Sequence, residues 1–129
     1  MEQGKKILEL IENVDPKDTD ALDEIDMEMH KLLYSWSGIR GKRPHIKYTR
    51  SRDALKEVRP EGFEFPKDVL TNVAGFIFGY GCPAFNNGKF LAYYKPLPTE
   101  ELAELHAIIQ AIMWERDNNK HIDNGTHSQ

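Results

Sequence analysis

Apolar side chains recur every three or four residues along several stretches of the chain, and this period is typical of amphipathic helices. Residues that cap helices, by accepting hydrogen bonds from the free amides of the first turn, stand before three of these stretches. They are Thr19 or Asp20, Ser51 and Thr99. The pattern predicts four helices, at residues 4–14, 20–37, 52–59 and 99–116.

Short runs rich in Phe, Ile, Tyr and Val predict four strands, at residues 45–50, 63–65, 73–80 and 90–95. Asn86-Asn87-Gly88 lies between the last two, and these residue types accept the positive φ of tight hairpin turns, so we expect antiparallel pairing. Apolar residues on both sides of 90–95 suggest that both sheet faces are covered at least partly. The predicted fold is α+β, a small antiparallel sheet of about four strands covered by helices, or αβα sandwich.

The chain of 129 residues fits one domain, and its 40 % hydrophobic and 29 % charged content is globular. We expect an N-terminal helical arm at residues 1–17, a single α+β sandwich domain at 18–116 and a disordered tail at 117–129, where Ile122 is the one apolar residue. The single cysteine, Cys82, excludes an intramolecular disulfide. No apolar run approaches the roughly 18 residues of a membrane span, so we expect a cytoplasmic protein.

Charge is unevenly distributed in a chain of net charge −4. Residues 39–59 carry eight basic side chains against two acidic ones, whereas residues 1–29 are acidic. The two segments either face each other or face water, or the basic run binds an anionic ligand; general nucleic-acid binding is not expected. Arginine suits phosphate, and aromatic rings can stack on a base. The candidate ligand-binding residues are Arg40, Lys42, Arg43, Arg50, Arg52, Tyr80 and Tyr94.

Catalytic patterns are not readable in the sequence. Asp26 and His30 are one helical turn apart, but a metal site needs three or four ligands, so we interpret them as part of a solvated acidic face. His106 is interpreted as a residue at the edge of the last helix's apolar stripe. Because no nucleophile–base pattern or phosphate-binding loop appears, we expect no enzyme activity, no metal and no cofactor.

The segment from Tyr48 to Phe63 resembles the signature of the phage αβα-sandwich domain family, in which Tyr-Thr-x-Ser-x-Asp-Ala is followed by a short apolar helix and Pro-x-Gly-aromatic. The matching residues are Tyr48, Thr49, Ser51, Asp53, Ala54, Pro60, Gly62 and Phe63. Phe63 stands where the family often has tryptophan. The resemblance covers roughly residues 18–116 and implies the fold class and a phage or prophage origin, but no catalytic residue.

Two functional hypotheses follow. The first is a non-catalytic phage or prophage accessory protein that binds a host protein, a phage protein or its own copies. The second is a small-ligand binder that sequesters an anionic molecule such as a nucleotide, which would suit an anti-defence role. An enzyme built from dispersed residues stays open as a third class.

Overall fold

The computed structural model describes residues 2–34, 46–92 and 96–127. These residues form four helices and five short strands. The helices are α1 (Glu2–Asn13), α2 (Thr19–Tyr34), α3 (Arg52–Val58) and α4 (Glu100–His127). The strands are β1 (Phe63–Glu64), β2 (Asp68–Thr71), β3 (Ile77–Gly81), β4 (Ala84–Asn86) and β5 (Lys89–Ala92). The α+β class is therefore confirmed.

Side-chain caps fix where the helices begin. Ser51 Oγ accepts from the Ala54 amide at 3.2 Å, and Thr99 Oγ1 accepts from the Leu102 amide at 3.1 Å, as predicted. For α2 the cap is Asp18, whose carboxylate accepts from the Ala21 amide at 3.1 Å. The predicted cap at Thr19 or Asp20 was therefore one or two residues too late.

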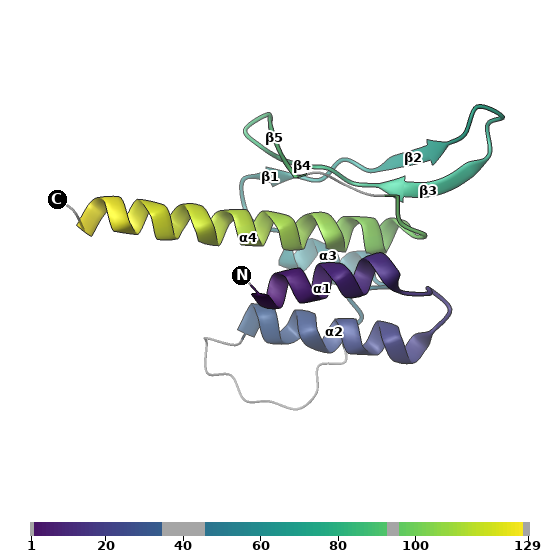
Figure 1. The fold of residues 1–129 in the computed structure, drawn as a ribbon, viewed down its shortest axis with the longest axis horizontal. Coiled ribbons are helices and arrows are strands. Elements are labelled where there is room, and N and C mark those ends of the chain that lie inside the picture. The colour runs from purple at the N-terminus through teal and green to yellow at the C-terminus, as the bar shows by residue number, and fades with distance from the viewer. Residues whose placement is uncertain (1, 35–45, 93–95, 128–129) are drawn as a thin grey trace.

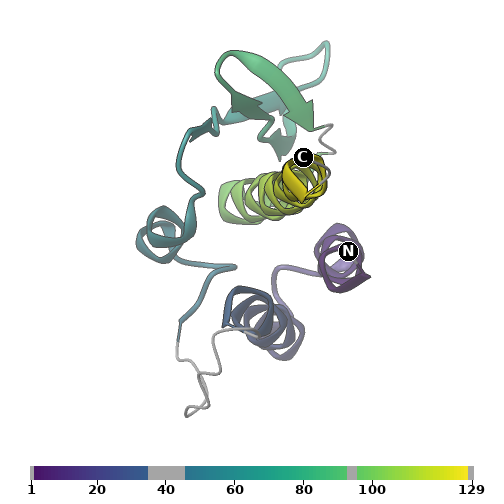
Figure 2. The same cartoon turned by 90° about the vertical axis from the view of Figure 1, so that its left-hand side faces the viewer.

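Helix α4 forms the centre of the molecule, with the strands on one side and α1 and α2 on the other (Figures 1 and 2). Every side chain from Leu102 to Ile109 is buried. Helix α1 belongs to this core, because Ile7 and Ile11 are completely buried, so the predicted arm at residues 1–17 is wrong. The apolar side chains of α1 pack against α2 and α4 and do not project into solvent.

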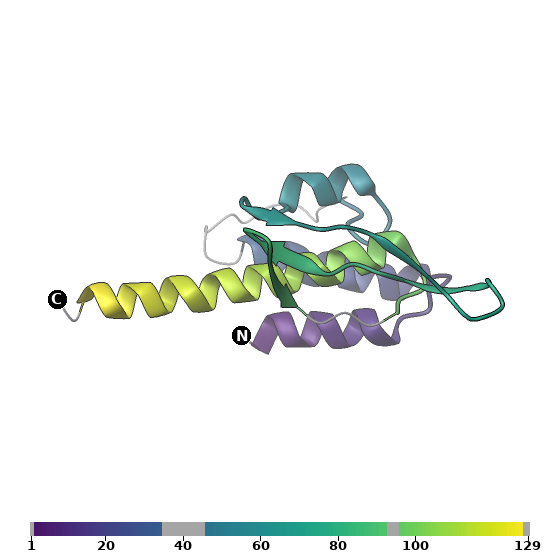
Figure 3. The ribbon, with the colours of Figure 1, turned by 90° about the horizontal axis from the view of Figure 1, so that it is seen from above.

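The last helix is longer than predicted. It continues to His127 and extends past the rest of the fold, whereas the polar composition predicted a disordered tail at 117–129 (Figures 1 and 3). No proline follows Pro98, so nothing in the sequence removes a backbone donor from the helical ladder.

The strands form two small antiparallel sheets instead of one, with orders β1-β4-β5 and β2-β3. The predicted turn is confirmed at Asn87 and Gly88, which have φ of 53° and 79°, and it joins β4 to β5. The predicted pairing of 73–80 with 90–95 is wrong, because β3 pairs with β2. The predicted strand at 45–50 is wrong for its described part, residues 46–50. The Arg50 amide donates to the Lys47 carbonyl at 3.0 Å in a turn, and Tyr48 is buried in the core.

The two sheets are one long ribbon with a break. The pairs Glu64↔Phe85 and Asp68↔Gly81 are four residues apart on each strand, so the register is continuous across the break. That register places Pro66 opposite Pro83, and neither residue can donate a hydrogen bond to the ladder. The ribbon is therefore divided into a part that packs on α4, where Phe63 and Trp114 meet edge to face at 5.7 Å, and a part that projects beyond it.

Candidate functional site

The projecting part of the ribbon, β2 and β3 with their connection at residues 72–76, is called the β2–β3 hairpin below. It extends past the start of α4, away from the helices (Figures 1 and 3). Among the described residues, it carries five of the six large apolar side chains that are at least half exposed. They are Val69, Val73, Phe76, Ile77 and Phe78. The expectation that both faces of the strands are covered therefore fails for this hairpin.

Apart from Asp68, the hairpin lies in an uncharged stretch that the sequence analysis did not identify as a site. Residues 69–88 contain no Asp, Glu, Lys, Arg or His, although 29 % of the chain is charged. Exposed strands are normally protected from pairing by charged side chains or proline. Their absence from an exposed strand is the sequence signal that could have identified this surface.

Asn72 organises the tip of the hairpin. Its side-chain oxygen accepts from the amides of Ala74 at 2.9 Å and Phe76 at 3.1 Å. Its own amide donates to the Phe76 carbonyl, and its carbonyl accepts from the Gly75 amide, both at 2.9 Å. Gly75 has φ of 86°, which favours glycine. Val73 and Phe76 are therefore presented to solvent from a turn with a fixed backbone.

The root of the hairpin is fixed to the start of α4. Tyr80 and Leu97 exchange two backbone hydrogen bonds, of 2.8 and 2.9 Å. A side chain at Gly79 would bring its Cβ to 2.9 Å from the Pro96 Cβ, so only glycine allows this close approach. The hairpin thus has a set direction relative to the core.

A buried carboxylate makes a second attachment at the root. Glu104 is completely buried; Arg59 approaches it at 2.7 Å and Lys67, just before β2, at 2.8 Å. Burial alone would raise the pKa of Glu104, but hydrogen bonds from these two cations outweigh it and hold the pKa below its usual value. Burial, and secondarily Glu104, raise the pKa of Cys82 to about 12, so this thiol is unreactive.

Lys47 and Arg50 of the basic run pair with carboxylates of α2. Arg50 contacts Asp23 at 2.5 Å and the buried Asp26 at 2.7 Å, and Lys47 contacts Asp23 at 2.8 Å. Hydrogen bonds from Lys47 and then Arg50 lower the pKa of Asp23 to about 2. The acidic and basic segments therefore face each other.

Arg52 is also paired, with Glu100 and with Glu101 at 3.5 Å, at the start of α4. Tyr80 is half-buried in β3, and among the described residues no hydrogen bond or ion pair joins it to either arginine. The other candidate ligand-binding residues, Arg40, Lys42, Arg43 and Tyr94, lie outside the described residues.

Two expectations about polar residues in helices are corrected. Asp26 is not on a solvated face: it is 4 % exposed and accepts a hydrogen bond from the Thr49 amide at 2.9 Å. This contact joins α2 to the turn before α3. His106 is buried within α4, 3.8 Å from Glu12 of α1, and not at the edge of the stripe.

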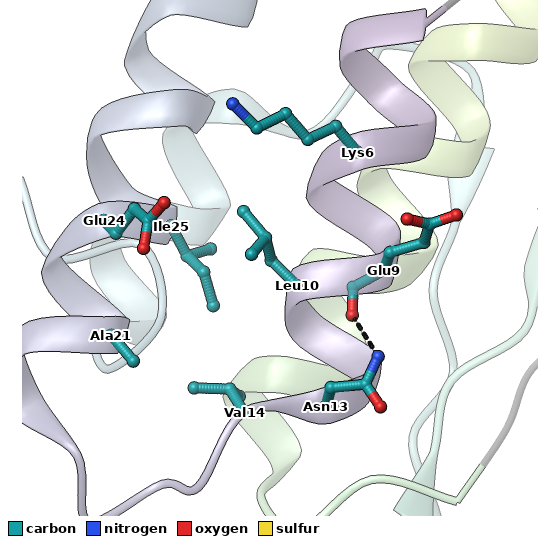
Figure 4. A pocket seen from close by; sticks show the side chains of 8 residues that line it. All are labelled: Lys6, Glu9, Leu10, Asn13, Val14, Ala21, Glu24 and Ile25. Carbon is teal, nitrogen blue, oxygen red and sulfur yellow. Dashed lines mark hydrogen bonds between the residues drawn. The ribbon is translucent and has the colours of Figure 1, made fainter.

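A groove between α1 and α2 has a volume of about 330 Å³ (Figure 4). Its apolar floor is shared by both helices, and charged groups of both signs stand at its rim. The lining residues are Lys6, Glu9, Leu10, Asn13, Val14, Ala21, Glu24 and Ile25. Another cavity, of about 150 Å³, lies beside Thr49 and Arg50.

The described part of the chain holds no group of three or more His, Cys, Asp or Glu residues placed to bind a metal ion. Its helices include none that is long and apolar enough to cross a membrane. Fold and surface together define a small α+β protein with an ordered, exposed apolar hairpin. Comparison of the chain with protein-family models, curated proteins and solved structures finds no match, so the resemblance to the phage family stays a prediction.

Proposed function

We propose that this protein is a non-catalytic binding protein, a phage or prophage accessory protein as the resemblance implies, and that its β2–β3 hairpin docks on a protein partner. The observation that carries the proposal is the ordered tip, which presents Val73 fully and Phe76 largely to solvent. Large apolar side chains exposed together on one hairpin are typical of interaction sites on soluble domains.

Burial of the hairpin would supply useful binding energy. Covering a large apolar side chain contributes about 1.5–3 kcal/mol, so the five partly exposed side chains can together contribute on the order of 5 kcal/mol. The Asn72 turn and the attachments at the root already order the backbone. Less conformational entropy is therefore lost on docking.

A lipid surface suits the hairpin less well than a protein. Binding at anionic membranes is strengthened by lysine and arginine beside the inserted apolar residues. Residues 69–88 carry no cation, and the whole chain has a net charge of −4. The hairpin therefore lacks the charge that holds peripheral proteins on anionic lipids.

The anionic-ligand hypothesis has less support. Its two described arginines, Arg50 and Arg52, each contact two carboxylates. An anion would have to compete with those carboxylates for the same guanidinium donors. This competition favours the partner-binding hypothesis.

The test is photocrosslinking from the tip in living bacterial cells. Val73 is replaced by the photoreactive residue p-benzoylphenylalanine, and the matched control carries it at the exposed Lys56 of α3. We expect one defined protein adduct from position 73, identified by mass spectrometry. It should be absent from position 56 and lost when Phe76→Ser and Phe78→Ser are added. A lipid adduct alone, no adduct, or the same adducts from both positions would refute the proposal.

A further inference from the structure

We infer that the hairpin's partner is a second copy of this chain, joined to the first by antiparallel pairing of the two β2 strands about a twofold axis. This inference rests on the proposed function, because it names the partner of the same surface. It follows from the hydrogen-bonding directions of β2, from its single charged residue and from the small area that the pairing covers.

The outer edge of β2 has backbone groups that point away from the ribbon. Tyr80 uses its amide and carbonyl to bond Leu97 on the far side of β3, so its pair with Val69 is of the non-hydrogen-bonded type. The amide and carbonyl of Val69 must then point outward. Thr71 lies two residues further and points the same way, since the register shift beyond Leu70 places the extra residue, Phe78, on β3.

Two such edges fit each other in one register. With the axis at Leu70, Val69 of each copy stands opposite Thr71 of the other. Each Val69–Thr71 pair then exchanges two backbone hydrogen bonds. The same register brings Val73 opposite Lys67 of the second copy. The tip of each hairpin therefore lies beside the root of the other, along the outer edge of β2.

Charge does not oppose this pairing. Asp68 is the only charged residue of β2, and in this register it stands opposite the neutral Asn72 of the second copy. A different protein would find little charge on this surface to recognise. A twofold dimer needs no complementary charge, because both copies contribute the same surface. The unprotected edge is a template for identical strands.

The exposed area suits a weak dimer. Edge pairing covers the outer side of β2 and the tip at Val73, whereas Ile77 and Phe78 stay on β3, one strand away from the second copy. The covered area is therefore below the roughly 800 Å² per partner of a standard stable interface. Including the backbone hydrogen bonds, we expect a reversible dimer with Kd in the micromolar range. This Kd corresponds to a binding free energy on the order of −8 kcal/mol.

The first test is sedimentation equilibrium of the purified full chain. The wild-type mass should rise with concentration from 14.9 kDa towards twice that value. Val69→Pro removes the outward amide, at an edge position that tolerates proline, and should weaken association at least about tenfold. Val69→Thr keeps the amide and the branched side chain and should still dimerise. Circular dichroism melts verify that both variants fold.

A charge exchange tests the register and does not depend on the proline variant. Val69→Lys with Thr71→Lys puts like charges opposite each other at two exposed positions, and Val69→Glu with Thr71→Glu does the same with the other sign. Each should be monomeric alone, and their mixture should form a heterodimer. Dimerisation of either variant alone, or no association in the mixture, would overturn the β2 pairing.

The two proposals can fail separately. If the wild type stays monomeric and position 73 crosslinks a different protein, self-pairing is wrong and the docking function stands. If the wild type stays monomeric and position 73 gives no protein adduct, both are wrong. A dimer that Val69→Pro and Val69→Thr retain equally would refute pairing through β2.

Discussion

Replacing Arg50 by glutamine should destabilise the fold, because it removes a cation from a buried carboxylate. Asp26 is 4 % exposed, and its described partners are the Thr49 amide at 2.9 Å and Arg50 at 2.7 Å. Removing one partner of a buried ion pair typically costs about 3–5 kcal/mol. The Arg50 side chain is 31 % exposed, so water can replace part of the contact. We therefore expect a loss of about 2 kcal/mol in the free energy of unfolding.

Urea denaturation at neutral pH measures this loss, and Arg52→Gln is the matched control. Arg52 belongs to the same basic run, but its side chain is 59 % exposed and its carboxylate partners lie at the surface. Its loss should cost less than about 1 kcal/mol. If Arg50→Gln costs no more than Arg52→Gln, the buried Asp26 does not depend on Arg50. The structural interpretation of the basic run would then be wrong, and ligand binding by both arginines would again be the better hypothesis.

Three further predictions concern the core and the two ends. Glu104→Gln should cost about 3 kcal/mol at neutral pH. The pKa of Glu104 is lowered in the folded state, so the unfolded wild type binds more protons and the stability of the fold falls as pH drops below about 4.5. Urea melts between neutral pH and pH 3 should show a shallower fall in stability for the variant. An equal dependence of stability on pH in both proteins would contradict the lowered pKa of Glu104. Ile11→Ala should cost about 2–5 kcal/mol in the same assay, whereas a loss below about 1 kcal/mol would restore the arm interpretation of α1. Deleting residues 119–129 should leave the free energy of unfolding nearly unchanged, because this part of α4 extends past the fold. A loss above about 1 kcal/mol in the free energy of unfolding would show that this segment packs on the fold.

Local chemistry predicted the features that depend on a few neighbouring residues. Ser51 and Thr99 cap their helices, and Asn87-Gly88 turns the chain between two antiparallel strands, because caps and tight turns use groups that are close in sequence. The α+β class followed from the same patterns. The limits of the elements were less accurate, since β2 and β4 lie outside the predicted strands.

Features that depend on distant parts of the chain were not predicted. The apolar stripe of α1 does not state its partner, so Ile7 and Ile11 were placed on an arm although they pack into the core. The division of the ribbon depends on Pro66 facing Pro83 across two strands, which only the register reveals. Asp26 was interpreted as solvated because the turn that covers it is far away in the sequence.

The candidate site shows the same limitation. The basic run was predicted to bind a ligand because clustered charge can be read from a sequence. In the structure, Arg50 forms ion pairs with Asp23 and Asp26 of α2. Residues 69–88 of the hairpin region contain no charged side chain and no histidine, so catalytic and charged motifs did not identify it. The absence of charge from residues 69–88 was readable, whereas the projection of Val73 and Phe76 from the fold was not.

The most direct test of the account measures what surrounds the tip of the hairpin. A nitroxide is attached at Val73→Cys; the native Cys82 is buried and its raised pKa keeps it from labelling. Collision rates with oxygen and with a water-soluble relaxation agent are followed as the protein concentration rises through the micromolar range, with and without lipid vesicles. A tip that docks on protein should become protected from both agents with rising concentration. Unchanged access of the water-soluble agent would contradict self-pairing through β2. Protection from that agent with increased oxygen collisions, seen only when vesicles are present, would contradict docking on a protein.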